Sequence, residues 1–323
     1  MLRPIILTIS LLVATVGNAQ RAFAQSYPDH SIQAVISFTA GSSTDIVGRI
    51  ILQKLSELWG VPVVPENRAG AGGLVGMSYV ARANPDGYTL LIDSTGHVVA
   101  PFMYPKSSVD VLHDFVDVAG FAIAPNVLVV RPDSPYRTLM DLVNAAKAAP
   151  GKINFGTAGV GSGTHLNLER LIAASGIQIT HIPYKGTPEV VAGILNGSVD
   201  CYWAPISAAI ANIKAGKLRP LAVSTPQRSG QLPEVPTTAQ AGVANADAPL
   251  WFGMWAPAGT PKPIVDKLSA DVRRVLSMPD LQQKLAGLGT DTMVMNPDEF
   301  AKFVRDELEV YSKLVAAAGI KAQ

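Results

Sequence analysis

Two segments of this sequence follow one plan, in which a glycine-rich loop joins a strand-like run to a helix-like run. Loop one covers residues 38–45 (Phe-Thr-Ala-Gly-Ser-Ser-Thr-Asp), and loop two covers residues 156–165 (Gly-Thr-Ala-Gly-Val-Gly-Ser-Gly-Thr-His). A β-branched run over 32–38 precedes loop one, and apolar residues at helical spacing follow it over 44–59. Such units, repeated along a chain, predict an α/β fold on mainly parallel sheets, of which we expect two.

The rest of the chain continues this alternation. We expect strands at 61–64, 88–92, 126–130, 153–156, 179–182, 198–202 and 218–223, and helices at 74–83, 139–148, 164–174 and 263–277. The last helix should begin at a capping box formed by Asn296 and Glu299 and should end at Gly319. Trp251, Phe252 and Trp255 are expected in the core.

The N-terminal residues have the pattern of a secretory signal. Arg3 supplies positive charge, residues 5–16 are apolar or small, and Ala22 and Ala24 give the small-x-small pattern of a cleavage site between Ala24 and Gln25. A second candidate site follows Ala19. The apolar run is shorter than the ~20 residues that span a bilayer, which disfavours a membrane anchor. We therefore expect a periplasmic mature protein that is not embedded in the membrane.

Charge and cysteine content exclude further classes. The sequence has 26 basic and 25 acidic residues, and two of the basic ones lie in the signal, so the mature charge is −1. Nucleic-acid binders normally carry a basic excess, so we expect no nucleic-acid partner. Cys201 is the single cysteine, which excludes an intramolecular disulfide and a cysteine-rich metal site.

The composition of the two loops suggests an anion site. Helix starts carry unpaired N–H donors and partial positive charge, glycine allows close approach, and Ser and Thr add hydroxyl donors. Neither loop contains Lys or Arg, which favours a carboxylate over a phosphate. The alternative is that both are ordinary capped turns. Neither G-x-G-x-x-G nor the P-loop pattern occurs, so a nucleotide cofactor is not expected.

Signs of catalysis are weak. Gly161-Ser162-Gly163 does not fit G-x-S-x-G, and Ser94 lies near Asp93 and His97 in sequence, where triad members rarely do. His165 and Glu169 share a helix face, but two ligands do not make a metal site. We expect no enzyme activity, no cofactor and no metal. A secreted serine hydrolase using Ser162 or Ser94 with a histidine, on a small ester or amide, is the alternative.

A set of short motifs, spread in order along the chain, resembles the tripartite tricarboxylate transporter substrate-binding proteins, also called the Bug receptors. The motifs are Tyr27-Pro28, Phe38-x-x-Gly41 with Thr44-Asp45, Glu66-Asn67-Arg68-x-Gly70-Ala71-Gly72-Gly73, Pro85-Asp86-Gly87-Tyr88-Thr89-Leu90-Leu91, Gly161-x-Gly163-Thr164-x-Leu166, Pro183-Tyr184-Lys185-Gly186, Lys214-Ala215-Gly216-Lys217-Leu218-Arg219 and Ala256-Pro257-Ala258-Gly259-Thr260-Pro261. Each alone is weak, but their order and spacing are specific.

The resemblance implies a two-domain periplasmic-binding-protein type II fold with a ligand cleft between the domains. Residues 1–24 would be the signal peptide, 25–124 with 250–323 domain 1, and 125–249 domain 2. The ligand would be a carboxylated metabolite held by backbone N–H groups, hydroxyls and waters. The expected ligand-binding residues are Phe38, Ala40, Gly41, Ser42, Ser43, Thr44, Asp45, Ser94, Thr157, Ala158, Gly161, Ser162, Gly163, Thr164, His165 and Tyr184.

One departure from the family pattern concerns loop one. Many members have one or two further glycines after Gly41, where this chain has Ser42 and Ser43. These side chains narrow the pocket or add donors. We expect a monomeric receptor for a small dicarboxylate, aliphatic or aromatic, that serves a membrane permease or a sensor. A structural exported protein is a third hypothesis and would bind no ligand saturably.

Overall fold

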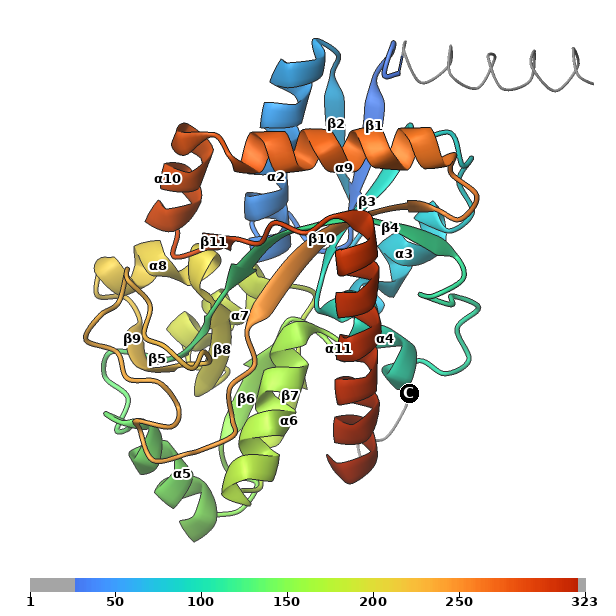
Figure 1. The fold of residues 1–323 in the computed structure, drawn as a ribbon. Coiled ribbons are helices and arrows are strands. Elements are labelled where there is room, and N and C mark those ends of the chain that lie inside the picture. The colour runs from blue at the N-terminus through green and yellow to red at the C-terminus, as the bar shows by residue number, and fades with distance from the viewer. Residues whose placement is uncertain (1–26, 319–323) are drawn as a thin grey trace, which may run out of the picture.

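The computed structural model describes residues 27–318, which form two β-sheets flanked by helices (Figure 1). The first sheet has the strand order β11-β4-β10-β3-β1-β2, and the second has the order β7-β6-β8-β5-β9. The strands are β1 (Ile32–Ile36), β2 (Val63–Asn67), β3 (Thr89–Ser94), β4 (Phe115–Ala124), β5 (Asn126–Val130), β6 (Asn154–Thr157), β7 (Thr180–Pro183), β8 (Cys201–Pro205), β9 (Arg219–Val223), β10 (Leu250–Pro257) and β11 (Asp291–Thr292).

Within 27–318 six α-helices overlap the predicted ones, and four others, over 96–103, 187–196, 206–214 and 279–287, were not predicted. The helices are α2 (Ser43–Trp59), α3 (Leu74–Val80), α4 (Gly96–Met103), α5 (Leu139–Ala148), α6 (Gly163–Ser175), α7 (Thr187–Asn196), α8 (Ile206–Lys214), α9 (Lys262–Leu276), α10 (Pro279–Gly287) and α11 (Pro297–Ala318), with a short 3₁₀ turn, η1 (Ala71–Gly73). The predicted capping box at α11 is confirmed, because Asn296 and Glu299 exchange backbone-to-side-chain hydrogen bonds of 2.9 Å each. The predicted signal peptide and Gly319 lie outside the described residues.

The prediction of mainly parallel sheets is wrong. β1 is parallel to β2 and β3, but β10 is antiparallel to β3 and β4, and β11 is antiparallel to β4. In the second sheet, β6 is parallel to β7 and β8, whereas β5 is antiparallel to β8 and β9. A strand–helix–strand crossover enforces parallel pairing. β4, β5 and β10 carry the chain between the sheets, so no such crossover constrains their direction.

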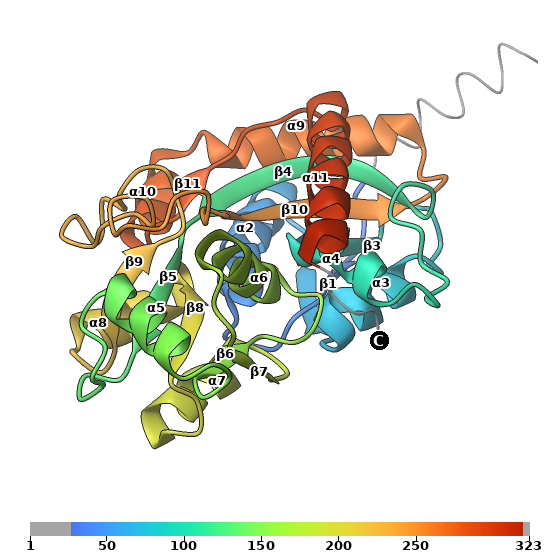
Figure 2. The ribbon, with the colours of Figure 1, turned by 90° about the horizontal axis from the view of Figure 1, so that it is seen from below.

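The chain passes directly from one sheet to the other at Pro125, which lies between β4 and β5. It returns between β9 and β10, and β4 and β10 run side by side across the molecule in both views (Figures 1 and 2). Every strand within 27–124 and 250–318 belongs to the first sheet, and every strand within 125–249 belongs to the second. We propose on this basis that the two groups of residues are domain 1 and domain 2, with the boundaries expected above.

Burial explains why the sequence did not predict β4 and β10. All eight residues of β10 are buried, including Trp251, Phe252 and Trp255, as expected for core residues. A strand that is buried on both faces loses the alternation by which strands are recognised in sequence. β4 is also mostly buried and was not predicted for the same reason. Among residues 27–318, no helix is long and apolar enough to cross a membrane.

Close packing around β10 predicts a stability difference between two glycines. A Cβ at Gly253 would lie 2.3 Å from Phe300 Cζ and 2.8 Å from Trp255 Cη2, and both rings are fully buried. A Cβ at Gly287, at the end of α10, would meet nothing within 4 Å. We expect Gly253→Ala to lower the free energy of unfolding by about 1–3 kcal/mol, and Gly287→Ala to change it by less than about 1 kcal/mol. Urea denaturation of both variants measures this, and equal midpoints would contradict the packing.

Candidate functional site

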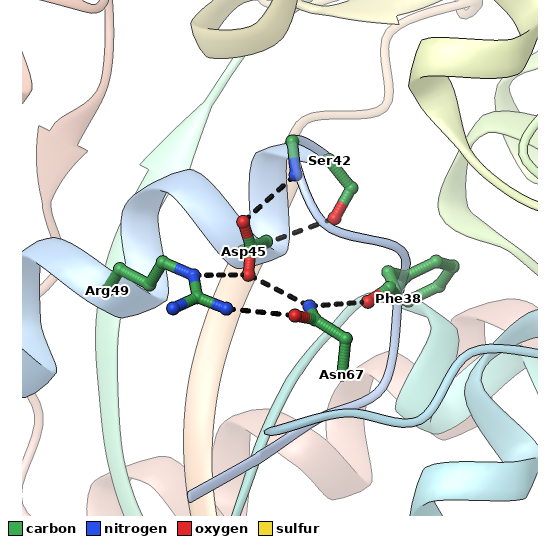
Figure 3. Close-up of polar contacts among 6 residues, drawn as sticks. Phe38, Ser42, Asp45, Arg49 and Asn67 are labelled. Atoms are coloured by element: carbon green, nitrogen blue, oxygen red, sulfur yellow. Dashed lines mark hydrogen bonds and ion pairs between the residues drawn. The ribbon is translucent and has the colours of Figure 1, made fainter. Parts of the chain in front are cut away.

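The buried carboxylate of Asp45 organises loop one at the start of α2 (Figure 3). Its Oδ2 accepts a hydrogen bond from the Gly41 N–H at 2.9 Å. Its Oδ1 accepts from Arg49 Nε at 2.6 Å and from Asn67 Nδ2 at 2.8 Å. The Ser42 hydroxyl caps the helix by accepting from the Asp45 N–H at 3.3 Å. Asp45 therefore braces the loop from behind, and the paired Arg49 offsets its negative charge.

Loop two is braced by its own hydroxyls at the start of α6. Ser162 Oγ accepts from the His165 N–H at 3.3 Å and donates to the Gly159 carbonyl at 2.7 Å. Thr164 Oγ1 accepts from the Ala158 N–H at 2.9 Å. These bonds hold the glycine-rich backbone in one conformation, so that the loop is preorganised.

The two loops face one another across a small cavity between the sheets. Of the sixteen residues predicted from the sequence, nine line this cavity: Phe38, Ser42, Ser43, Thr44, Ser94, Ala158, Ser162, Gly163 and Thr164. The cavity volume is about 20 Å³, enough for roughly one water molecule. The hydroxyls of Thr44 and Ser94 lie at its wall and, within 27–318, have no hydrogen-bond partner. No side chain in this lining is charged.

The other seven predicted residues do not line this cavity. Ala40 and Gly41 are exposed on the outside of loop one. Asp45, Thr157, Gly161 and His165 instead take part in hydrogen bonds that hold the backbone of the two loops. Tyr184 lines a neighbouring cavity together with Phe38 and Ala158.

Three residues that line the cavity were missed: Thr187, Pro205 and Leu250. Thr187 begins α7, and its hydroxyl lies 2.9 Å from that of Tyr202. Its sequence signal was the Pro188 that follows it, since proline favours the first turn of a helix. Pro205 and Leu250 carry no such signal, because tertiary folding alone brings the ends of β8 and β10 to the cavity.

Contacts across the cavity join the two proposed domains. Ser43 Oγ in α2 and Ser207 Oγ in α8 form a short hydrogen bond. The backbone at Gly72 lies so close to loop two that a Cβ there would be 2.5 Å from the Val160 carbonyl oxygen. The structure is thus that of a closed cleft.

Two stacked histidines support loop two from the side away from the cavity. The rings of His165 and His181 lie 4.5 Å apart at 14°. His165 Nδ1 accepts from the Gly161 N–H at 3.3 Å, and His181 Nε2 lies 2.6 Å from the Thr157 hydroxyl. Burial, and then the neighbouring His165, lower the pKa of His181 to about 4, while Glu169 acts in the opposite direction. His181 is therefore neutral at pH 7.

The pair of His165 and Glu169, considered above as a metal-binding candidate, has its side chains 3.4 Å apart. Within 27–318, no group of three or more His, Cys, Asp or Glu side chains is arranged to hold a metal ion. The pair instead helps to hold loop two, since His165 accepts a hydrogen bond from the Gly161 N–H and Glu169 lies against the other ring nitrogen.

Residues 47–320 match the model of the tripartite tricarboxylate transporter family receptor, which covers most of the chain. The chain belongs to this family. The receptor is 38% identical over 312 residues to the UPF0065 protein in the tcbD-tcbE intergenic region of Pseudomonas sp. strain P51, covering 96% of this chain and 93% of that protein. The family resemblance inferred from the short motifs is thereby confirmed.

Two solved structures share the receptor's fold. Rpa4515 of R. palustris with adipate is 33% identical, with a TM-score of 0.89 over 92% of this chain and 100% of that one. MatC from Rhodopseudomonas palustris with bound malate is 30% identical, with a TM-score of 0.84 over 90% of this chain and 100% of that one. The expected periplasmic-binding-protein fold is confirmed, and by family the chain is a solute-binding receptor.

The partly buried His181 predicts a loss of stability in acid. The pKa of histidine in the unfolded state is near 6.5, whereas that of folded His181 is about 4. Between these pH values the unfolded state therefore binds one proton that the folded state does not. The free energy of unfolding should fall as pH drops from 6.5 to 4. Because His181 is partly exposed, we expect a loss of about 1–2 kcal/mol. His181→Gln should remove this part of the pH dependence, while His113→Gln, at an exposed histidine, should not. Chemical denaturation at several pH values tests this, and an unchanged slope in His181→Gln would refute it.

Proposed function

We propose that this receptor captures a small carboxylate, in particular a dicarboxylate, in the cleft between loop one and loop two. The observation that carries the proposal is the cavity at two helix starts, whose lining includes seven serine and threonine residues and no acidic side chain that would repel an anion. The structural neighbours solved with adipate and with malate support it, since both ligands are dicarboxylates. Because the donors of the cleft are uncharged, we expect the affinity to fall only slightly as the salt concentration rises.

We infer that the protein is exported, is cleaved after Ala24, and acts as a monomer in the periplasm. The pattern of residues 1–24 supports export, and the family description supports a partner in a tripartite transporter. The receptor would hand its ligand to the membrane permease of that system or present it to a sensor.

The hydrolase alternative has no support in the geometry. Ser162 Oγ bonds to the Gly159 carbonyl and lies 3.0 Å from Thr164 Oγ1. His97 is fully buried behind the cleft, stacked 4.0 Å from the ring of Trp255. Within 27–318, neither Ser94 nor Ser162 shares a hydrogen bond with a histidine ring, which a nucleophile would need.

Binding requires the cleft to open and close. The inner cavity has room for about one water and is too small for a carboxylate group. The two loops therefore have to separate for entry and re-form around the ligand. Chain passages at Pro125 and between β9 and β10 are the natural hinge for such a movement.

A carboxylate screen with matched threonine variants tests the proposed function. Thermal shift should identify at least one carboxylate that stabilises the protein, and EDTA should leave the shift unchanged. Hydrogen bonds to charged groups are worth ~1.5–3 kcal/mol, so Thr44→Ala should weaken binding roughly ten- to a hundredfold. Thr164→Ala should weaken binding by a similar factor for another reason, because it removes the bond from the Ala158 N–H that braces loop two. Thr180→Ala, exposed on the edge strand β7, should bind as wild type. A sugar or cation as best ligand, or wild-type affinity in both site variants, would overturn the proposal.

Cleft closure predicts different outcomes for two glycines with similar backbones. Gly72 and Gly60 have φ of +66° and +69°, so alanine at either position has the same left-handed strain of ~1–2 kcal/mol. Only at Gly72 does a Cβ meet the opposite domain, since at Gly60 nothing lies within 4 Å. We expect Gly72→Ala to weaken binding at least tenfold and Gly60→Ala to leave it unchanged.

Small-angle scattering checks the same pair. Saturating ligand should reduce the radius of gyration of wild type and Gly60→Ala, but less so that of Gly72→Ala. Identical scattering responses in the two variants would place closure elsewhere.

A further inference from the structure

A second, larger cavity lies beside the inner one and shares two of its wall residues, Phe38 and Ala158. Its volume is about 220 Å³. The glycine-rich turn at 70–73 and the backbone of Gly159 and Val160 form two of its sides. A ligand anchored by a carboxylate between the loops would extend into this outer cavity.

The volumes of the two cavities indicate what each can hold. An apolar cavity of ~150 Å³ accommodates a benzene ring. The outer cavity, at about 220 Å³, therefore has room for a ring with a small substituent. The inner cavity is about a tenth as large, at about 20 Å³, so that even when the two loops re-form around a ligand it suits only the carboxylate end.

The walls of the outer cavity favour a flat, apolar body. Tyr104 and Tyr184 line it with Phe38. Tyr184 Oη lies against Gly193, and Tyr104 Oη lies 3.5 Å from the Val160 carbonyl at the cavity wall. Phe38, Tyr104 and Tyr184 are the aromatic residues of this lining. Aromatic rings attract one another in offset or edge-to-face contact.

One positive charge lies at this cavity. Lys185 is exposed at the mouth, and it is the only charged residue in the linings of the two cavities, both of which fall within the described residues. A ligand with a second acidic group at its far end would place that group near this ammonium. Because Lys185 is exposed, its effect should be modest and should be screened by salt.

We propose that the outer cavity is a subsite for a ring-sized flat body, and that the ligand is an aromatic or cyclic unsaturated dicarboxylate. One carboxylate lies between the two loops, the ring lies against Tyr104, and the second acid lies near Lys185. This inference rests on the proposed function and adds the class of ligand to it.

Calorimetric titration with three probes tests the subsite. The probes are benzene-1,4-dicarboxylate, adipate as an aliphatic diacid of similar span, and benzoate as the ring without the second acid. Wild type should bind benzene-1,4-dicarboxylate at least tenfold more tightly than adipate, and three- to tenfold more tightly than benzoate. Adipate binding as tightly as the aromatic diacid would overturn the inference while leaving the proposed function intact.

Three variants separate the parts of the site. Tyr104→Leu should weaken both aromatic probes at least fivefold and adipate less than twofold, which also controls for a change in folding or closure. Lys185→Met should weaken the two diacids two- to fivefold and leave benzoate unchanged. Thr44→Ala should weaken all three probes. Equal losses for adipate and the aromatic diacid in Tyr104→Leu would overturn the ring subsite, as would failure of all three probes to bind wild type, whereas the proposed function falls only if the carboxylate screen finds no ligand.

Discussion

The buried Asp45 carboxylate is the interaction on which the cleft depends. A charged group at this depth is costly unless donors surround it, and here Gly41, Arg49 and Asn67 supply them. Asn67 also donates to the Phe38 carbonyl at 2.9 Å, which ties the end of β2 to the start of loop one. The carboxylate thus fixes the loop's backbone while Arg49 offsets its charge, so an incoming anion meets the donors of the helix start.

The sequence allowed prediction where the local pattern decides the structure. β5 and α5 have the predicted bounds, since one is a compact apolar run and the other has a capping residue and helical spacing. β4 and β10 were not predicted, because burial on both faces removes the alternation of apolar and polar residues by which strands are recognised. The same limit applies to the site. Nine loop residues were recognised from composition, whereas Pro205 and Leu250 line the cavity only because folding brings distant strand ends together.

Hydroxyls in the cleft fall into two groups with different roles. Those of Ser162 and Thr164 are used within loop two and make it rigid. Those of Thr44 and Ser94 face the cavity and are available to a ligand. Preorganised donors reduce the entropy lost on binding, because the loop is already ordered before the ligand arrives. Loop two can therefore contribute to affinity through its own internal bonds, without every hydroxyl touching the ligand.

Neutral donors in the inner cavity also suit a receptor that has to release its ligand. A buried arginine would bind a carboxylate strongly, and most differences in affinity between related complexes lie in the dissociation rate. Hydroxyls and N–H groups give up the same anion faster when the cleft opens and water replaces them. Lys185, at the exposed mouth, can attract anions during approach without holding them in the closed cleft. Placing the charge outside and the neutral donors inside separates capture from retention.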